Sequence, residues 1–415
     1  MTQSWRKGRR VAVIGAGPGG VSTAIAMLKA GYDVRLYERN PAPKPLGGAV
    51  LLSVPVLAVL RHYGVDIGDS FGQKVRTEFR NPKGQVRVRL GFNAAVERAM
   101  GIEGWHYGIL RSSAFERMMD ILTRLDPDCL QAGQAFQSYE DTGDEIVVRF
   151  DSGSTVTADL VVGADGIRSG VSRQAFGDPG LFHVGLRVWL AWCEDIPDLP
   201  KDVGALAHGR TVQASYFPMK HDGKPGFEWW IVEKSGESAP APPDTPQAVE
   251  AHLRALLRGF SGPVTRFIDH TDVARQVFRW EIYNRPSLPH YTRGRVACVG
   301  DAVHPVSPYA AYGMGMAIED GYFLARSFEG RDLDPAVLAA GFARYEAERV
   351  AYCNHQVEFA RKLGNQFHHA PAPVAWLRDQ IFDRTGILQR LIEKDYLADA
   401  EKMSMQLREL HVAQA

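Results

Sequence analysis

Asp301 comes directly after an apolar run, and this placement makes it a candidate ligand-binding residue. The run, Val296 to Val299, consists of small and β-branched residues and ends at Gly300, as expected of a buried parallel strand. In open α/β sheets, ligands bind at the carboxyl ends of such strands. Taken alone, the pattern also fits an ordinary strand and loop whose aspartate is simply solvated.

Two glycines, Gly313 and Gly315, follow this strand and precede a predicted helix from about Met316 through Ala325. Glycine lets the backbone approach a ligand closely. The start of a helix presents free N–H groups and the positive end of the helix dipole. The segment therefore predicts a site for an anionic or hydrogen-bond-accepting group.

A second segment near the N-terminus has the pattern of a dinucleotide-binding unit. In order, it contains a strand over residues 11–14, the glycines Gly15, Gly17 and Gly20, a helix over 21–30, a strand over 33–37 and the acidic Glu38. The glycines permit a tight turn and close approach of a pyrophosphate, and an acid at the next strand's end accepts hydrogen bonds from ribose hydroxyls. The alternative is a glycine-rich turn with Glu38 merely solvated.

A third apolar strand, Leu160 to Gly163, also ends in an acid, because Asp165 and Gly166 follow it closely. By itself this would be a plain β-turn at Asp-Gly.

The three segments together carry a family resemblance. GAGPGG with Glu38, GADG at Gly163 to Gly166, and GDAVHP at Gly300 to Pro305 resemble the motifs of the single-component FAD-dependent aromatic hydroxylases, which share the para-hydroxybenzoate hydroxylase fold. The resemblance covers roughly residues 11 to 350 and specifies the cofactor and the fold more than the substrate.

The resemblance implies an α/β protein with a Rossmann-like FAD-binding domain interleaved with a mainly antiparallel β-sheet substrate domain, plus C-terminal helices. The expected boundaries are 11–75, 105–180 and 285–345 for the FAD domain, 76–104 and 181–284 for the sheet domain, and 346–415 for the helical segment.

The resemblance also implies roles for single residues in holding FAD. Glu38 would bind the adenosine ribose, with Arg39 beside the adenine, and Asp165 would lie near the pyrophosphate. Asp301 would bind the ribityl chain. Arg111 would begin a helix and reach the pyrophosphate region, its alternative being a surface charge at a helix end. The full set of implied cofactor-binding residues is Gly15, Gly17, Gly20, Glu38, Arg39, Gly48, Arg111, Asp165, Asp301, Pro308, Gly313, Met314 and Gly315.

The flavin ring would be covered by Pro308, and the backbone from Gly313 to Gly315 would offer N–H groups to its N1–C2=O edge. The chain departs from the family here. Many relatives have Gly-Gln-Gly followed by Asn, whereas this chain reads Tyr312-Gly-Met314-Gly. Backbone donors survive this change, and wall packing is the simplest interpretation of Tyr312 and Met314.

The interval from Phe182 to Tyr283 is rich in aromatic residues and partly alternating, which predicts strands of an antiparallel sheet that roofs the flavin. Aromatic residues in a sheet usually fill the core, so Trp189, Tyr216, Trp229 and Trp230 are all weak candidates for contact with the substrate. The predicted substrate-pocket residues are His106, Arg187, Tyr216, Trp229 and Tyr312.

The function implied is that of a hydroxylase. NADH or NADPH would reduce FAD, reduced flavin would capture O2 as a C4a-hydroperoxide, and one oxygen would pass to an aromatic or N-heterocyclic small molecule. The alternatives are a flavin-dependent halogenase, an isoprenoid reductase of the same fold, and a non-catalytic FAD-binding protein that shields an intermediate. No residue is assigned as the catalytic base.

Composition agrees with this interpretation. The 415 residues exceed one ordinary core, and the formal charge of zero gives no electrostatic argument for nucleic acid. No apolar run approaches the roughly 20 residues that span a bilayer. The four cysteines are scattered without a CxxC pair, so no metal site is predicted. We expect a cytoplasmic protein, because glycines and a proline interrupt the apolar stretch behind the basic N-terminus and so argue against a signal peptide. We also expect a monomer or homodimer.

Overall fold

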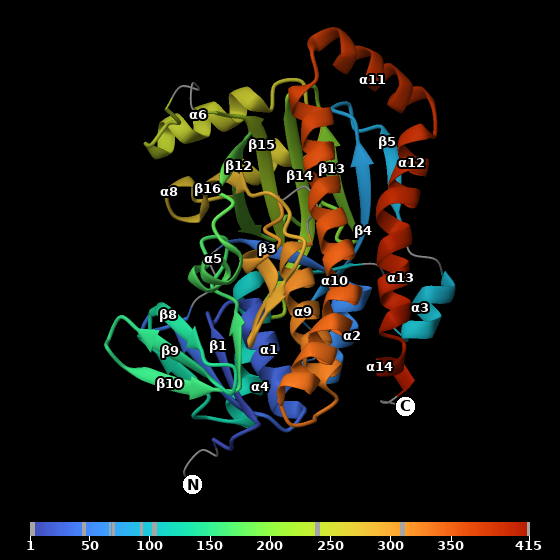
Figure 1. Ribbon diagram of the computed structural model, residues 1–415. Coiled ribbons are helices and arrows are strands. Elements are labelled where there is room, and N and C mark those ends of the chain that lie inside the picture. The colour runs from blue at the N-terminus through green and yellow to red at the C-terminus, as the bar shows by residue number, and fades with distance from the viewer. Residues whose placement is uncertain are drawn as a thin grey trace.

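The computed structural model describes residues 5–43, 47–65, 68, 71–91, 94–101, 106–236, 241–307 and 312–412. Its lower half in Figure 1 is a layer of sheet and helices, and its upper half is built on a large sheet. The long helix α10, Pro335–Gly364, runs past both halves (Figure 1). The mixed α/β architecture confirms the predicted fold class.

A six-stranded sheet forms the lower half, in the order β17-β18-β11-β1-β2-β7. All its pairings are parallel except that between β17 and β18. Its strands are β1 Arg10–Ile14, β2 Asp33–Glu38, β7 Leu130–Ala132, β11 Leu160–Gly163, β17 Thr292–Arg293 and β18 Val296–Cys298. The three strands that the sequence predicts from their apolar runs, β1, β11 and β18, therefore lie side by side with their carboxyl ends at one edge.

Four helices accompany this sheet: α1 Pro18–Lys29, α4 Arg111–Leu125, α5 Gly170–Phe176 and α9 Gly313–Phe328. A small antiparallel sheet lies beside them, made of β8 Phe136–Asp141, β9 Ile146–Phe150 and β10 Thr155–Ala158. The helix α1 begins at a proline directly behind Gly17, since proline lacks only an N–H that the first turn does not use.

The large sheet has nine strands and is mainly antiparallel, in the order β16-β12-β15-β14-β13-β4-β6-β3, with β5 paired to β4. Its strands are β3 Ala49–Ser53, β4 Gln73–Arg80, β5 Val86–Leu90, β6 His106–Leu110, β12 Phe182–Glu194, β13 Val203–His208, β14 Val212–His221, β15 Lys224–Lys234 and β16 Phe278–Asn284. Two of them, β3 and β6, come from segments that the sequence assigns to the FAD domain.

The two faces of the large sheet pack against different parts of the molecule. On one face, side chains of β12, β14 and β15 form a separate core with α6 Pro246–Leu256 and α7 Val264–Asp269. The short α8, Val273–Gln276, leads back into β16. The opposite face looks toward the lower half, with α2 Val54–Tyr63 following β3.

The C-terminal segment continues helically, as predicted, and covers the β4–β5 edge of the sheet (Figure 1). Its helices are a π-helical turn Asn365–His369, α11 Ala372–Arg384, α12 Ile387–Ile392, a second π-helical turn Glu393–Leu397, α13 Ala398–Gln406 and α14 Glu409–Val412; α3 Ala94–Met100 lies against α13. The side chain of Arg87 in β5 bonds Asp383 at 2.7 Å and Asp379 at 3.3 Å in α11.

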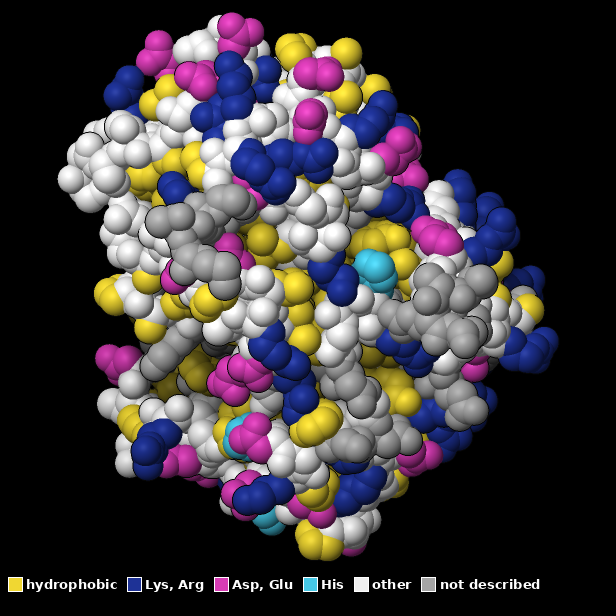
Figure 2. Space-filling model, turned by 90° about the horizontal axis from the view of Figure 1, so that it is seen from below, with side chains coloured by type: hydrophobic (Ala, Val, Ile, Leu, Met, Phe, Trp, Pro, Cys, Tyr) yellow, Lys and Arg dark blue, Asp and Glu magenta, His cyan; other side chains and the backbone are white. Residues whose placement is uncertain are grey.

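Charges of both signs are interspersed on the face seen in Figure 2, without a broad patch of one sign. Within the described part of the chain, no helix combines the length and the apolar character that crossing a membrane requires.

Candidate functional site

A cavity of about 410 Å³ lies where the two halves meet. This volume is in the range of small-molecule and cofactor sites. The residues that line it include Gly17, Pro18, Gly19, Ala49, Leu51, Arg111, Ala164, Gly166, Val188, Leu190, Phe217, Glu228, Trp230, Trp280, Asp301, Ser307, Tyr312, Gly313, Met314 and Gly315. The cavity therefore joins all three segments that the sequence singles out.

The glycine turn between β1 and α1 needs its glycines for different reasons. Gly15 has a φ of 102°, and a Cβ atom there would lie 2.5 Å from the carbonyl oxygen of Ala164. A Cβ on Gly20 would lie 1.9 Å from the Gly15 carbonyl oxygen. A Cβ on Gly17 would meet nothing within 4 Å, because this glycine borders the cavity. These are the tight turn, the close packing of the helix and the open approach that a pyrophosphate requires.

Glu38 ends β2 and binds the glycine turn. Its carboxylate accepts hydrogen bonds from the backbone N–H of Ala16 at 2.9 Å and from the backbone and side chain of Asn40 at 2.9 and 2.8 Å. The adjacent Arg39 is exposed. Neither residue lines the described cavity, so their contacts with a ribose and an adenine stay predictions.

Asp165 points to α5. Its carboxylate accepts hydrogen bonds from the backbone N–H groups of Gly170 at 2.7 Å and Val171 at 3.3 Å, and from the hydroxyl of Ser169. Burial raises the pKa of Asp165, and the bond from Ser169 opposes this rise. The cavity is lined instead by the neighbouring Ala164 and Gly166. The side chain thus stabilises the turn, and a pyrophosphate would meet the backbone here.

Asp301 lies in a short 3-10 turn, Gly300–Ala302, behind β18. Its side chain is accessible from the cavity that it borders, and protein surrounds this cavity. Burial raises the pKa of Asp301, whereas the charges of His304, Arg111 and Arg285 lower it. Asp301 is therefore a hydrogen-bonding carboxyl in an enclosed site.

Arg111 begins α4 and also lines the cavity. Burial lowers the pKa of Arg111, and the carboxyls of Glu228 and Asp301 oppose this. Its backbone N–H donates to the carbonyl of Gly48 at 3.1 Å. Arg111 is half-buried and borders the cavity, which favours an inward-facing charge over a surface charge at a helix end, and its contact with a pyrophosphate stays a prediction.

The helix α9 begins at Gly313, three residues earlier than the sequence predicts, and Tyr312 precedes it. A Cβ on Gly313 would lie 2.8 Å from Val306 Cγ1, and one on Gly315 would lie 2.7 Å from Val56 Cγ2. Close packing against the two valines thus explains both glycines within a regular first turn, whose N–H groups border the cavity. Pro308 falls outside the described residues.

Tyr312 lines the cavity and also begins a chain of buried polar contacts. Its hydroxyl donates to Glu319 in α9, and Arg349 in α10 donates to Glu319 at 3.0 Å and to Asp320 at 2.8 Å. The side chains of Glu319, Asp320 and Arg349 are fully buried. The departure from the family pattern at Tyr312 is therefore more than wall packing, because its hydroxyl is part of this network.

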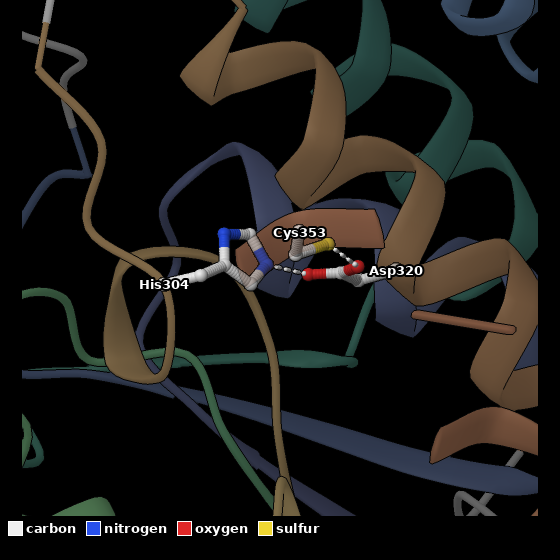
Figure 3. Close-up of side chains that lie close together, drawn as sticks. All are labelled: His304, Asp320 and Cys353. Atoms are coloured by element: carbon white, nitrogen blue, oxygen red, sulfur yellow. Dashed lines mark hydrogen bonds and ion pairs between the residues drawn. The ribbon is translucent and has the colours of Figure 1, made fainter. Parts of the chain in front are cut away.

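The network continues to a cluster of three potential metal ligands, His304, Asp320 and Cys353, shown in Figure 3. Asp320 Oδ2 lies 2.5 Å from His304 Nε2 and accepts a hydrogen bond from the N–H of Gly300 at 2.8 Å. Burial lowers the pKa of His304, but Cys353 and Asp320 raise it well above its ordinary value. Because Arg349 already supplies a cation to the other oxygen of Asp320, we interpret the cluster as an ion-pair network that fixes the 3-10 turn against α9.

Three of the predicted substrate-pocket residues are on the wrong face of the large sheet. Tyr216 and Trp229 belong to the core under α6 and α7, where the rings of Tyr216 and Phe267 lie 5.1 Å apart and are tilted by 47°. Arg187 bonds Glu281 at 2.5 Å and Glu233 at 3.3 Å on that same face. The reason is the two-residue period of a strand, which sends neighbours to opposite faces.

The other two predicted pocket residues lie closer to the site. Tyr312 lines the main cavity. His106 borders a smaller cavity of about 30 Å³ that shares Leu51 and Trp230 with the main one. Burial lowers the pKa of His106 well below its ordinary value, so this histidine is neutral.

The structure adds cavity residues that the sequence does not single out. Phe217, Trp230 and Trp280 supply aromatic walls, and Glu228 supplies a carboxyl. The one available signal for Glu228 was an acidic residue in the apolar run FEWWIV.

Comparison with known proteins agrees with the site. The chain has the fold and the glycine-rich cavity of an FAD-binding protein, and the family model described as FAD binding domain matches residues 9–360. The chain belongs to this family, that of the single-component FAD-dependent aromatic hydroxylases, and FAD is its cofactor.

Three similar proteins illustrate the membership. The 6-hydroxynicotinate 3-monooxygenase of Pseudomonas fluorescens is 28% identical over 82% of this chain and 87% of its own length. Aurachin C monooxygenase/isomerase of Stigmatella aurantiaca is 26% identical, with 91% and 94% covered. A variant of Klebsiella pneumoniae HpxO, solved with FAD, is 25% identical with a TM-score of 0.79, and 93% of this chain and 98% of that one are covered. The protein is an FAD-dependent monooxygenase of this kind.

Proposed function

We propose that the protein uses NADH or NADPH and O2 to hydroxylate an aromatic or N-heterocyclic small molecule. The observation that carries the proposal is the contrast between the two walls of the cavity. The lower wall is rich in glycine and backbone N–H groups, whereas the upper wall, formed by the large sheet, is aliphatic and aromatic apart from Glu228. A cofactor with phosphates suits the first wall and an aromatic ring suits the second.

We assign the lower wall to the cofactor. Gly15, Gly17 and Gly20 would admit the pyrophosphate, and Asp301 would bind the ribityl chain. The first turn of α9, from Gly313 to Gly315, would direct its N–H groups to the flavin ring, where a helix N-terminus stabilises negative charge.

When bound, FAD supplies the redox chemistry of the reaction. The side chains of the upper wall exclude water and orient the ring that is hydroxylated. Phe217 and Trp230 meet edge to face at 5.8 Å, which gives this wall a fixed aromatic surface.

The decisive experiment is to purify the protein, measure its FAD content and screen small aromatic and N-heterocyclic compounds for stimulated NADH or NADPH oxidation. The panel includes 6-hydroxynicotinate, 3-amino-4-hydroxybenzoate and uric acid, which the names of similar proteins mention. Hydroxylation consumes O2 and adds the mass of one oxygen atom to the product.

The same assay distinguishes the alternatives. A reductase works without O2, a halogenase depends on added halide, and a shielding protein oxidises neither cofactor. A protein that cannot be reconstituted with FAD contradicts the proposal as a whole.

Asp301→Ala tests the assignment of the lower wall. We expect FAD to bind about 10- to 100-fold more weakly, because a hydrogen bond to a charged group contributes about 1.5–3 kcal/mol. The measurement is a titration of the apoprotein with FAD followed by flavin fluorescence. Asp198→Ala, which removes an exposed carboxylate paired with Arg266, is the control and leaves FAD affinity unchanged. Equal affinity in Asp301→Ala removes the assignment.

We also propose that the protein works in the cytoplasm as a monomer or homodimer. Size-exclusion chromatography with light scattering measures the oligomeric state directly.

A further inference from the structure

The upper wall of the cavity contains one ionisable residue among the described residues, and this residue is Glu228. The other lining side chains of this wall come from β3, β12, β14, β15 and β16 and are aliphatic or aromatic. Glu228 and Trp230 point to the cavity from β15, whereas Trp229 and Ile231 between and beyond them point to the core under α6. An isolated carboxyl in an apolar wall is typical of the few polar groups that orient a ligand.

One oxygen of Glu228 is engaged by the protein, and the other faces the cavity. Oε2 accepts a hydrogen bond from the backbone N–H of Ala49 at 2.9 Å. Oε1 has no hydrogen-bond partner among the described residues. Because Glu228 lines the cavity, a ligand there can supply a hydrogen-bond partner to this oxygen, and such a bond contributes about 0.5–1.5 kcal/mol.

The neighbouring chain is shaped around this carboxyl. A Cβ atom added to Gly48 would lie 2.2 Å from each of the two carboxyl oxygens of Glu228. Any other residue at position 48 would therefore displace the carboxyl from the cavity wall. The pair of Gly48 and Glu228 holds the acid at a fixed place over the site.

We propose that Glu228 binds the substrate: its Oε1 atom hydrogen-bonds an acceptor oxygen or nitrogen at the edge of the aromatic or N-heterocyclic ring that is hydroxylated. This inference rests on the proposed function and sharpens it, because it names the group on the ring that the enzyme recognises. The substrate class is a ring with a carbonyl, an oxygen substituent or a bare ring nitrogen directed at the large sheet.

The surroundings of Glu228 favour a protonated carboxyl, which can donate a hydrogen bond. Burial raises the pKa of Glu228 well above its ordinary value, and the Ala49 N–H and the charge of Arg111 oppose this only in part. Cys193 of β12, which points to the core on the opposite face of the sheet, also interacts electrostatically with Glu228. A carboxyl that keeps its proton presents an O–H group, which an acceptor on the ring can use.

The test uses 1-methyl-2-pyridone, a ring with a carbonyl acceptor, no donor and no proton to lose in the pH range used. Its binding to the FAD-loaded protein is followed by the change in flavin absorbance, without NADH or NADPH. We expect the affinity of the wild type to fall as pH rises through the pKa of Glu228, because the carboxylate cannot donate. Glu228→Gln keeps a donor that does not titrate, so its affinity becomes independent of pH.

A second variant measures the hydrogen bond itself. Glu228→Met fills similar space without a donor, and we expect about tenfold weaker binding, as for the loss of one hydrogen bond of about 1.4 kcal/mol. The matched control is Glu233→Gln on the same strand. Glu233 faces the opposite side, where it binds Trp189 at 2.7 Å, so this variant follows the wild type.

Infrared spectroscopy provides a readout that needs no ligand. The wild type should show the C=O band of a protonated carboxylic acid that Glu228→Gln lacks and Glu233→Gln retains.

Several results overturn the proposal. They are an unchanged pH dependence in Glu228→Gln, full affinity in Glu228→Met, failure of the pyridone to bind the wild type, or absence of the acid band. A changed flavin affinity in Glu228→Met with normal pyridone binding also overturns it, because Glu228 would then contact the cofactor. Failure of the proposed function is distinguishable, since it appears as a lack of bound FAD or of O2-dependent NADH or NADPH oxidation.

Discussion

Glu228 and Asp320 are both enclosed by protein, yet the pKa values of their carboxyls are shifted in opposite directions. Asp320 meets Arg349 at 2.8 Å and His304 at 2.5 Å; although burial favours its neutral form, these cations lower the pKa of Asp320 to about 2. Glu228 receives one backbone N–H, and burial raises its pKa. The difference teaches that partners decide the state of a buried acid: the paired carboxyl stabilises the fold, and the unpaired one is available to a ligand.

The largest effect is expected from removing the guanidinium of Arg349, the cation that pairs with Asp320. Arg349→Met leaves Glu319 and Asp320 buried without it, and we expect a loss of about 3–5 kcal/mol in the free energy of unfolding. Urea unfolding of the FAD-loaded protein measures the loss. The control Arg266→Met breaks an exposed pair with Asp198 and changes stability little. Equal stability of Arg349→Met and the wild type would refute the structural role of the network.

The loss of folding stability at low pH tests the same network through Asp320. The pKa of Asp320 lies at about 2 in the folded protein, below the ordinary value of 3.8. Its contribution is therefore present above about pH 4 and is lost as pH falls toward 2. Between pH 5 and pH 3 we expect Asp320→Asn to abolish about 1 kcal/mol of this acid-dependent loss, because one pKa unit corresponds to about 1.4 kcal/mol and the rest of the loss occurs below pH 3. Urea midpoints measured from pH 5 to pH 3 provide the test, and parallel curves for the two proteins would contradict the prediction.

The smallest effect on folding stability is expected at Glu228, and its pH dependence is opposite to that of Asp320. Because its folded pKa is raised, the stabilising contribution of this carboxyl is present at low pH and is lost as pH rises through that pKa. Glu228→Gln should cost less than about 1 kcal/mol at acidic pH, since the amide oxygen keeps the bond to Ala49. At alkaline pH the variant should be the more stable protein. Thermal unfolding across pH measures this crossing, and a constant difference at every pH would show that Glu228 does not titrate on folding.

The sequence predicted the lower half of the molecule better than the upper half. Three strands of this half, β1, β11 and β18, were recognisable from their apolar runs. Each run ends at glycines or an aspartate, which are typical of a tight turn or a ligand site. The start of α9 was placed at Met316 instead of Gly313, because glycines that serve close packing look the same in sequence as glycines of a loop.

The upper half was harder because both faces of its sheet are covered. A sheet with one wet face alternates apolar and polar residues, and the alternation shows which side is inside. Apart from Glu228, the run FEWWIV in β15 is apolar on both sides, since α6 and α7 cover one face and the cavity borders the other. Trp229 and Trp230 were therefore indistinguishable, and the sequence favoured the wrong one.

The contact of β5 with the C-terminal helices has a consequence for the order of synthesis. Arg87 and its partner Asp383 are 296 positions apart, so the ribosome completes β5 long before α11 can cover it. Until then the strand at the margin of the sheet has unpaired backbone groups, which can join to strands of other chains. We expect chaperones to matter most during this interval, and premature termination before α11 is complete to yield aggregated product in place of a smaller folded enzyme.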